Sequence, residues 1–409
     1  MNITGIVAEY NPFHEGHRYH IEKSREKATS DLMIAVMSGS FTQRGIPAFF
    51  DKFSRAETAV KNGIDIVCEM PFTASLTSAE YFAREGVSLL NALGCDTISF
   101  GSESGDTEDL NKIAELLFYE NPELSQLIKE GLSEGLSYPA SVKRALDTSN
   151  PVLSSLLDSP NNTLGIEYLK AIKSMGFNMK AMTINRAGLD YHAGEGHFDR
   201  DTTVVESCFP SSSLLRQRMI ASGTEKYLEN DDFTGILSGK IHSLSQTVGT
   251  SDNKIDFTVF ADINHDLSDR INNEIHTPYT FTSLTERLKT KNLTYARICR
   301  CLWHIILDIK NEDLLTIKKS SSPEYIRILA FSEKGGKYLK EYNQRTENDA
   351  LLPKLIIRPA RDLRYLPNQS HISFFRELNA AKLYRQAYYE KYRLYLPDDY
   401  TYTIKPGTV

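Results

Sequence analysis

Residues 5–17 read Gly-Ile-Val-Ala-Glu-Tyr-Asn-Pro-Phe-His-Glu-Gly-His, and this stretch decides the fold of the first half of the chain. Residues 1–8 form an apolar run that is typical of a short buried strand. Asn11, Pro12 and Gly16 break that pattern, and helical spacing resumes after them. A strand, a tight turn and a helix start bring backbone N–H groups and the positive end of a helix dipole to one place, where phosphates bind. The stretch therefore predicts a phosphate site.

Two histidines, His14 and His17, bracket Gly16 at the predicted turn. Glycine has no side chain, so the backbone can approach a phosphate closely. Imidazole groups can donate hydrogen bonds to a phosphoryl group whose charge is being redistributed. A lone histidine is usually structural, but two at this spacing after a strand favour a functional pair. We predict that both are catalytic.

Strands and helices alternate through the first 105 residues. Apolar strands are predicted to end near Met37, Glu69 and Phe100, and a later strand is predicted over residues 179–184. Strands that alternate with helices imply right-handed crossovers and a parallel sheet. Ligands on such sheets bind at the carboxyl ends of the strands. We therefore predict an α/β fold with a Rossmann-like parallel sheet, followed by a mainly α-helical C-terminal region.

The length of 409 residues calls for two or three domains. We predict a catalytic domain over residues 1–220, a connecting segment over 221–278 and a basic, mainly helical region over 279–409. No apolar run approaches the roughly 18–20 residues of a membrane span, and no secretory signal is apparent. The five cysteines are scattered, which favours free thiols in the cytoplasm and no zinc site. We expect no membrane or DNA partner.

The net charge of −6 hides an asymmetry. Residues 281–409 hold 23 Lys and Arg against 14 Asp and Glu, or +9, and the other 280 residues hold 24 against 39, or −15. The same C-terminal third contains 12 of the 21 tyrosines. Basic residues interleaved with aromatic ones suit RNA. Charge alone, however, favours the alternative of a solvated helical domain whose tyrosines form a core.

The pattern His-Glu-Gly-His after an N-terminal strand resembles the HxGH signature of nucleotidyltransferases and adenylate-forming synthetases. The longer string over residues 5–20 resembles the bacterial tRNA(Met) cytidine acetate ligase family. Further matching segments are MSGSFTQRG at 37–45, DKFSRAE at 51–57, FGSES at 100–104, NNTLGIEYLKA at 161–171 and INRAGLDYH at 184–192.

The resemblance implies a two-step reaction. Acetate and ATP form acetyl-adenylate, and the wobble cytidine of elongator tRNA(Met) then takes the acetyl group to give 4-acetylcytidine. ATP is the implied co-substrate, with Mg²⁺ bound to it. The implied ATP-binding residues are Val7, Ala8, Glu9, Tyr10, Asn11, Pro12, Phe13, His14, Glu15, Gly16, His17, His20, Gly101, Asn162 and Arg186.

A serine run leading into a helix, Ser211 to Arg216, resembles the second phosphate-binding signature of that superfamily. Leu214 replaces a hydroxyl residue of the usual form, so this position departs from the signature. Three basic residues could either neutralise phosphates or serve the structure, and the sequence does not decide between these roles: Arg44, Lys52 and Arg55. Candidate acids for Mg²⁺ are Glu9, Asp51 and Glu69, but no spacing fixes a protein cage, so we predict no dedicated metal site.

Basic residues near the start of the C-terminal third are candidates for tRNA contact. Lys289 and Lys291 lie in a break between apolar helical positions, and Arg297 and Arg300 lie one helical turn apart and extend the same stripe. Two other functions stay open at this stage. One is a small-molecule nucleotidyltransferase or synthetase without an RNA substrate, and the other is a non-catalytic, ATP-sensing RNA-binding protein.

Overall fold

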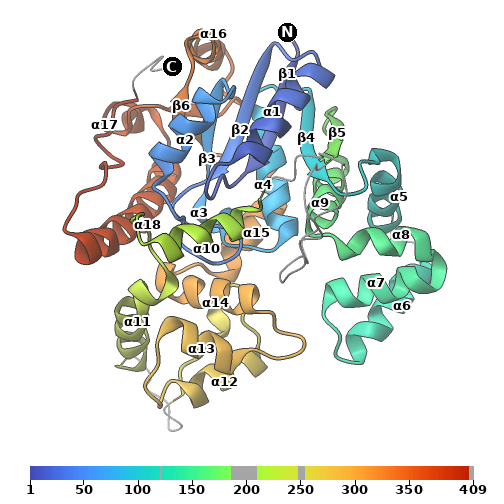
Figure 1. Cartoon of the computed structure of the whole chain (residues 1–409), viewed down its shortest axis with the longest axis vertical. Helices are drawn as coiled ribbons and strands as arrows, with labels where there is room; N and C mark the ends of the chain where they lie inside the picture. Colours follow the sequence, from blue (N-terminus) through green and yellow to red (C-terminus); the bar gives the residue numbers. More distant parts are fainter. Residues whose placement is uncertain (120–121, 186–209, 247–253, 405–409) are drawn as a thin grey trace, which may run out of the picture.

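The computed structural model describes residues 1–119, 122–185, 210–246 and 254–404 (Figure 1). Within them, strands join into one sheet in the order β5-β4-β1-β2-β3-β6-β7, and all neighbours are parallel except β3 and β6. The strands are β1 Ile3–Ala8, β2 Leu32–Ser38, β3 Ile66–Met70, β4 Thr97–Ser102, β5 Lys180–Asn185, β6 Tyr325–Phe331 and β7 Lys354–Ile356. The predicted parallel α/β sheet is confirmed.

The first strand lies where the strand order reverses. β2 and β3 follow on one side of β1, while β4 and β5 lie on its other side. In register, Thr4 of β1 faces Met33 of β2 and Thr97 of β4. In open α/β sheets the ligand crevice forms outside the carboxyl ends of strands at such a reversal. The turn after β1 is therefore at the position where this sheet type binds ligands.

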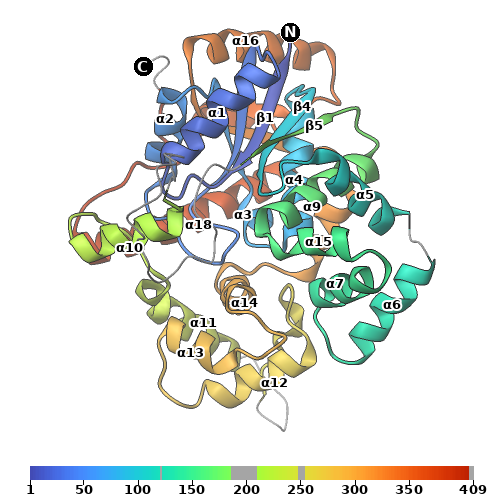
Figure 2. The ribbon, with the colours of Figure 1, turned by 45° about the vertical axis from the view of Figure 1, so that its right-hand side comes forward.

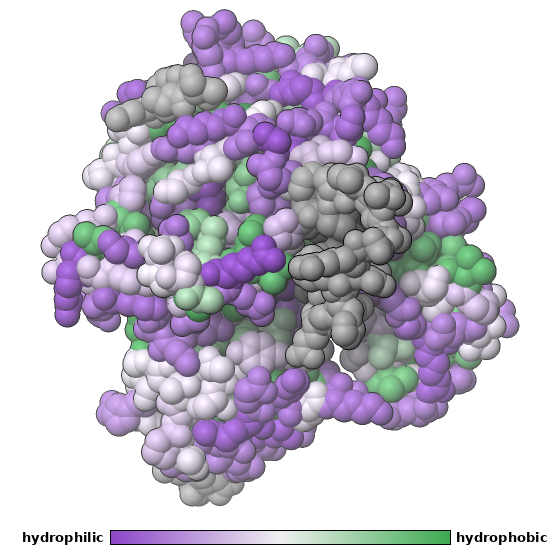
Figure 3. Space-filling model, viewed as in Figure 1, coloured by the Kyte–Doolittle hydropathy of each residue, from purple (hydrophilic) through white to green (hydrophobic). Residues whose placement is uncertain are grey.

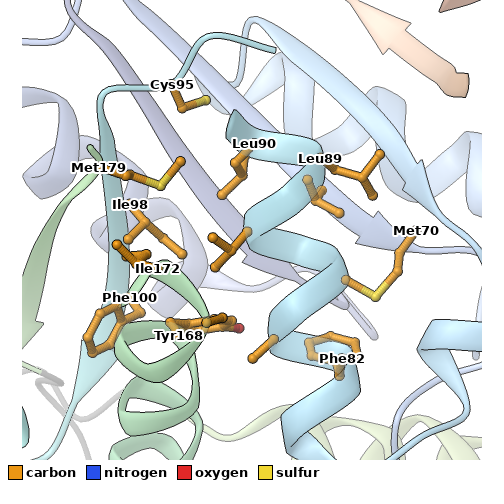
Figure 4. Close-up of a cluster of buried hydrophobic side chains, with 14 of the residues drawn as sticks. Met70, Phe82, Leu89, Leu90, Cys95, Ile98, Phe100, Tyr168, Ile172 and Met179 are labelled. Atoms are coloured by element: carbon orange, nitrogen blue, oxygen red, sulfur yellow. The ribbon is translucent and has the colours of Figure 1, made fainter. Parts of the chain in front are cut away.

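Helices cover both faces of the sheet. α1 (Glu15–Lys27) and α2 (Lys52–Lys61) pack on one face. α4 (Ala79–Ala92) and α9 (Pro160–Met175) pack on the other, where Leu90, Phe100 and Tyr168 meet in a buried cluster (Figure 4). A Cβ on Gly86 of α4 would lie 2.8 Å from a methyl group of Val7. Glycine there lets α4 approach β1 closely and fixes the strand that carries the turn.

Two helical groups extend away from the sheet in both views (Figure 1, Figure 2). One is a lobe of α5 (Thr107–Phe118), α6 (Pro122–Ser133), α7 (Tyr138–Ser149) and α8 (Pro151–Ser155). The other packs around the fully buried Trp303. It holds α11 (Thr234–Gln246), α12 (His265–Glu274), α13 (Phe281–Leu288) and α14 (Tyr295–Leu307). The remaining helices are α3 Phe72–Ser75, α10 Ser212–Ser222, α15 Asn311–Lys319, α16 Glu333–Asn348, α17 Pro359–Asp362 and α18 Asn368–Tyr392.

The C-terminal third is mainly helical, as predicted, but it also completes the sheet. β6 pairs antiparallel with β3, and β7 pairs parallel with β6. Residues 221–278, predicted to be a connecting segment, supply Phe233, Phe257 and Leu267 to the core around Trp303. Their apolar side chains are buried, so the described parts of this segment, 221–246 and 254–278, pack within the helical body. None of the helices in the described ranges combines the length and apolar character needed to cross a membrane.

Candidate active site

The turn after β1 is held by its own two histidines. His14 caps α1, and its Nδ1 accepts a hydrogen bond from the backbone N–H of Gly16 at 3.1 Å. In the opposite direction, Nδ1 of His17 accepts a hydrogen bond from the backbone N–H of His14 at 3.3 Å. The two rings stack with centroids 3.8 Å apart. This reciprocal capping fixes both imidazoles at the N-terminus of a helix that follows the central strand.

The backbone contacts also fix which ring nitrogen carries the proton. A nitrogen that accepts from a backbone N–H bears a lone pair, so the neutral imidazole of His14 or His17 carries its hydrogen on Nε2. Both residues then offer an Nε2–H donor. Two such donors beside the positive end of α1 form a suitable environment for a phosphoryl group. The structure thus brings the two predicted catalytic histidines together.

Aromatic and polar neighbours hold the rest of the turn. Tyr10 is fully buried with φ 46°, and its ring lies 5.0 Å from that of His17 and 5.1 Å from that of Phe13. His20 reaches the central strands, where its Nε2 lies 3.1 Å from the Ser99 hydroxyl of β4. Five residues of the predicted site are half-buried: Val7, Ala8, Phe13, His14 and His17. The predicted ATP-binding stretch therefore combines buried anchors with partly accessible groups.

A second group approaches the turn from α10. Ser211 caps this helix, because its hydroxyl accepts from the backbone N–H of Leu214 at 3.2 Å. Leu214 makes this contact through its backbone, so the capping does not need the hydroxyl side chain of the usual signature. Arg216 donates to the carbonyl oxygen of Asn11 and, at 3.1 Å, to the Ser213 hydroxyl. The Arg44 guanidinium also donates to the Ser213 hydroxyl, at 3.3 Å. Two guanidinium groups thus converge beside the histidine turn.

The carboxyl end of β4 is fixed by Asn162. This side chain is 2% exposed, and its Oδ1 accepts from the Ser102 hydroxyl at 2.7 Å and from the Glu103 N–H at 3.3 Å. Gly101 lies directly before these residues, half-buried at the strand end. Sequence reasoning marked Gly101 and Asn162 but missed Ser102, whose place in a Gly-Ser-Glu-Ser segment after a strand was the available signal. Direct nucleotide contact by Gly101 and Asn162 stays a prediction.

Lys52 and Arg55 lie at the same edge of the sheet but are engaged inside the protein. Lys52 is 5% exposed and pairs with Glu69, at 2.7 Å, and with Asp399. Arg55 is 2% exposed and donates to the carbonyl oxygens of Glu9, at 2.6 Å, and of Ser38, Gly39 and Phe50. Neither side chain is available for a phosphate. Of the two roles that the sequence left open, these contacts favour the structural one.

The acids considered for Mg²⁺ are also engaged. Glu9 accepts from the Gln43 N–H at 2.7 Å, Asp51 caps α2, and Glu69 holds Lys52. Over the described ranges, no three His, Cys, Asp or Glu side chains are grouped as metal ligands. Mg²⁺ bound to ATP usually keeps several waters and needs few protein ligands.

The predicted tRNA residues divide into two pairs. Lys289 and Lys291 are exposed, as expected. Arg300 is 8% exposed and donates to the Gln43 carbonyl at 3.1 Å, and Arg297 pairs with Asp262 at 3.0 Å. Arg300 therefore joins α14 to the loop that holds Gln43, and the predicted basic stripe does not continue to it. Arg186, His192 and His197 lie outside the described residues.

Comparison with known proteins agrees with this geometry. The model of the HIGH Nucleotidyl Transferase family matches residues 1–395. A tRNA(Met) cytidine acetate ligase of Clostridium perfringens is 35% identical over 368 residues, which is 85% of this chain and 88% of that protein. One of Thermoanaerobacter is 35% identical over 405 residues, or 95% and 96% of the two chains.

The chain belongs to the tRNA(Met) cytidine acetate ligase family. It is accordingly an enzyme of the ligase class built on a HIGH nucleotidyltransferase sheet. The similarity is also structural. Thermotoga maritima TmcAL bound with α-thio ATP aligns over the full length of both chains, with a TM-score of 0.81 at 27% identity. The apo form of that protein gives 0.79 over 95% of each chain.

Proposed function

We propose that this protein activates acetate with ATP and transfers the acetyl group to the wobble cytidine of elongator tRNA(Met), forming 4-acetylcytidine. The observation that carries the proposal is the stacked pair of imidazoles, His14 and His17, whose Nδ1 atoms accept from the backbone at the N-terminus of α1, after the central strand. The tRNA(Met) and acetate are named by the relatives of this chain, and α-thio ATP is bound by a structural neighbour.

In the first step, an acetate oxygen attacks the α-phosphorus of ATP while the bond to the β-phosphate oxygen breaks. Pyrophosphate leaves and acetyl-adenylate forms. Such reactions need little covalent help from a protein, so positioning and charge stabilisation dominate. His14 and His17 donate to the α-phosphate as its charge grows. Arg216 and Arg44, which share the Ser213 hydroxyl, stabilise the departing phosphates.

In the second step, the exocyclic amine of the cytidine attacks the acetyl carbon. AMP leaves, and the nitrogen loses one proton as the amide forms. The positive C-terminal third, with +9 over residues 281–409, supports an RNA substrate for this step. A small-molecule synthetase needs only the sheet domain, so the additional basic, helical body favours the RNA-modifying ligase over that alternative.

The test is the source of the acetyl group. The enzyme is incubated with tRNA(Met), ATP, isotopically labelled acetate and unlabelled acetyl-CoA, and the nucleosides of the product are analysed by mass spectrometry. We expect the label in 4-acetylcytidine and none from acetyl-CoA. An unlabelled acetyl group on the tRNA would overturn the adenylate mechanism, and adenylate formation without any tRNA product would favour the small-molecule synthetase.

A further inference from the structure

α17 and α18 lie on one side of the molecule (Figure 1). Their surface combines exposed arginines with exposed aromatic and apolar side chains. Tyr365, Ile372 and Phe375 are 66%, 58% and 49% exposed. Arg358, Arg361 and Arg364 are exposed at three-residue intervals beside them. We call these six residues the arginine–aromatic patch. On the face in Figure 3, where hydrophilic residues dominate, hydrophobic residues gather in small groups, some of them over α10 and α18.

The patch stands on a rigid support. Leu363, Leu366 and Phe374 alternate with its residues along the chain and are buried against Tyr325 of β6 and Ile356 of β7. The exposed side chains are therefore not the ones that stabilise this part of the fold. Large apolar side chains that are exposed on a firmly packed element, and that are not needed for packing, are typical of interaction surfaces.

The charge of the patch points to a polyanion. Residues 358–375 contain three arginines and one acid, Asp362. Asp362 is 8% exposed, and it accepts from the backbone N–H groups of Ile357 and Arg358 and from Arg361 Nε at 2.6 Å. Across the described ranges, neither Arg358 nor Arg364 forms an ion pair with a carboxylate. Two cations are thus presented to solvent without a neutralising partner.

The aromatic component distinguishes RNA from a simple anion. The Arg364 guanidinium lies over the Tyr365 ring, 5.4 Å from its centroid, and so orients the ring. The ring remains two-thirds exposed. Oriented aromatic rings stack on unpaired bases, and neighbouring arginines contact the phosphates.

The position of the patch suits a large substrate. β7, which leads into it, lies four strand spacings from β1, or about 19 Å across the sheet at about 4.8 Å per spacing. Because β7 runs antiparallel to β1, this value is the separation across the sheet alone, and only a ligand much larger than a nucleotide reaches both places. We propose that the arginine–aromatic patch is an RNA-binding surface on which Arg358 and Arg364 contact phosphates and Tyr365 stacks on an unpaired base; this rests on the proposed function above.

The experiment measures tRNA(Met) affinity of the full-length enzyme across a salt series. Removing two phosphate contacts in Arg358→Gln/Arg364→Gln lowers the slope of log affinity against log salt by about 1.4–1.8. Tyr365→Ala weakens binding about 5- to 150-fold, and Tyr365→Phe, which keeps the ring, binds like the wild type. The control Lys337→Gln/Lys340→Gln removes two exposed charges from α16, a separate helix that packs against β6 and β7, and leaves affinity and slope unchanged.

Acetate-dependent pyrophosphate exchange without tRNA is measured on the same proteins and stays at the wild-type rate in all of them. If the wild type binds tRNA and the patch variants bind it equally well with the same slope, the inference is wrong. The inference is also wrong if the variants leave tRNA binding unchanged and alter only the oligomeric state measured by sedimentation. The patch is then a contact between copies of the chain. A wild type that binds no tRNA(Met) overturns the proposed function itself.

Discussion

The histidine turn and the buried charge cluster make a direct comparison. The histidine turn follows β1, and the buried charge cluster, which we define as Lys52, Arg55, Glu69 and Asp399, lies at the ends of the next two strands. Both are polar groups at the carboxyl edge of one sheet. His14 and His17 are half-buried, whereas Lys52 and Arg55 are 5% and 2% exposed.

The difference lies in where the polar atoms are satisfied. In the turn, Nδ1 of each ring accepts from a backbone N–H, and both rings stay half-buried. In the cluster, the ammonium group of Lys52 is paired with two carboxylates, and Arg55 donates to four backbone carbonyls. Location at the carboxyl edge therefore does not by itself make a polar group a ligand contact, and the internal partners of Lys52 and Arg55 favour a structural role.

The largest effect is expected at the histidine turn. His14→Ser keeps a side-chain oxygen that caps α1 but removes the Nε2–H donor, and His17→Ala removes the second donor. Because one lost donor to a developing charge costs about 10²–10³ in rate, we expect that loss in tRNA acetylation by either variant. Thermal unfolding should stay near the wild-type midpoint. His242→Ala, an exposed histidine on α11, is the control and should keep full activity.

The buried charge cluster should respond in the opposite way. Lys52→Met leaves Glu69 and Asp399 buried without their cation, and breaking such a pair typically costs about 3–5 kcal/mol of unfolding free energy. Chemical denaturation measures the loss, and Lys61→Met, at an exposed position of the same helix, should cost little. A Lys52→Met protein of normal stability but with a raised KM for ATP would contradict the structural role.

The comparison also shows what the sequence could predict. Strands β1 to β4 were predictable because each is a short, mainly apolar run bounded by glycine, proline or polar residues, and β5 because its residues alternate. The histidine pair was predictable because both histidines belong to the contiguous string His-Glu-Gly-His at residues 14–17. Lys52 and Asp399 are 347 positions apart, so no local spacing reveals that one neutralises the other. For the same reason, the pairing of β6 with β3 was missed, since only tertiary packing selects the partner of a strand.

A smaller effect is expected at the exposed lysines that remain of the predicted tRNA stripe. Lys289→Gln/Lys291→Gln should lower the salt slope of tRNA binding by roughly 1.4–1.8 if both contact phosphates. Arg300→Met should instead lower stability, because this arginine is buried against the loop that holds Gln43. An unchanged salt slope in the lysine variant would place the RNA elsewhere, with the arginine–aromatic patch as the remaining contact.

The central claim is that the histidine turn activates acetate without help from RNA. It is tested most directly by exchange of labelled pyrophosphate into ATP, measured without tRNA, with and without acetate. We predict exchange in the wild type only when acetate is present, the same exchange in Lys289→Gln/Lys291→Gln, and none in His14→Ser/His17→Ala. Exchange that persists in the double histidine variant, or that proceeds in the wild type without acetate, would contradict the account.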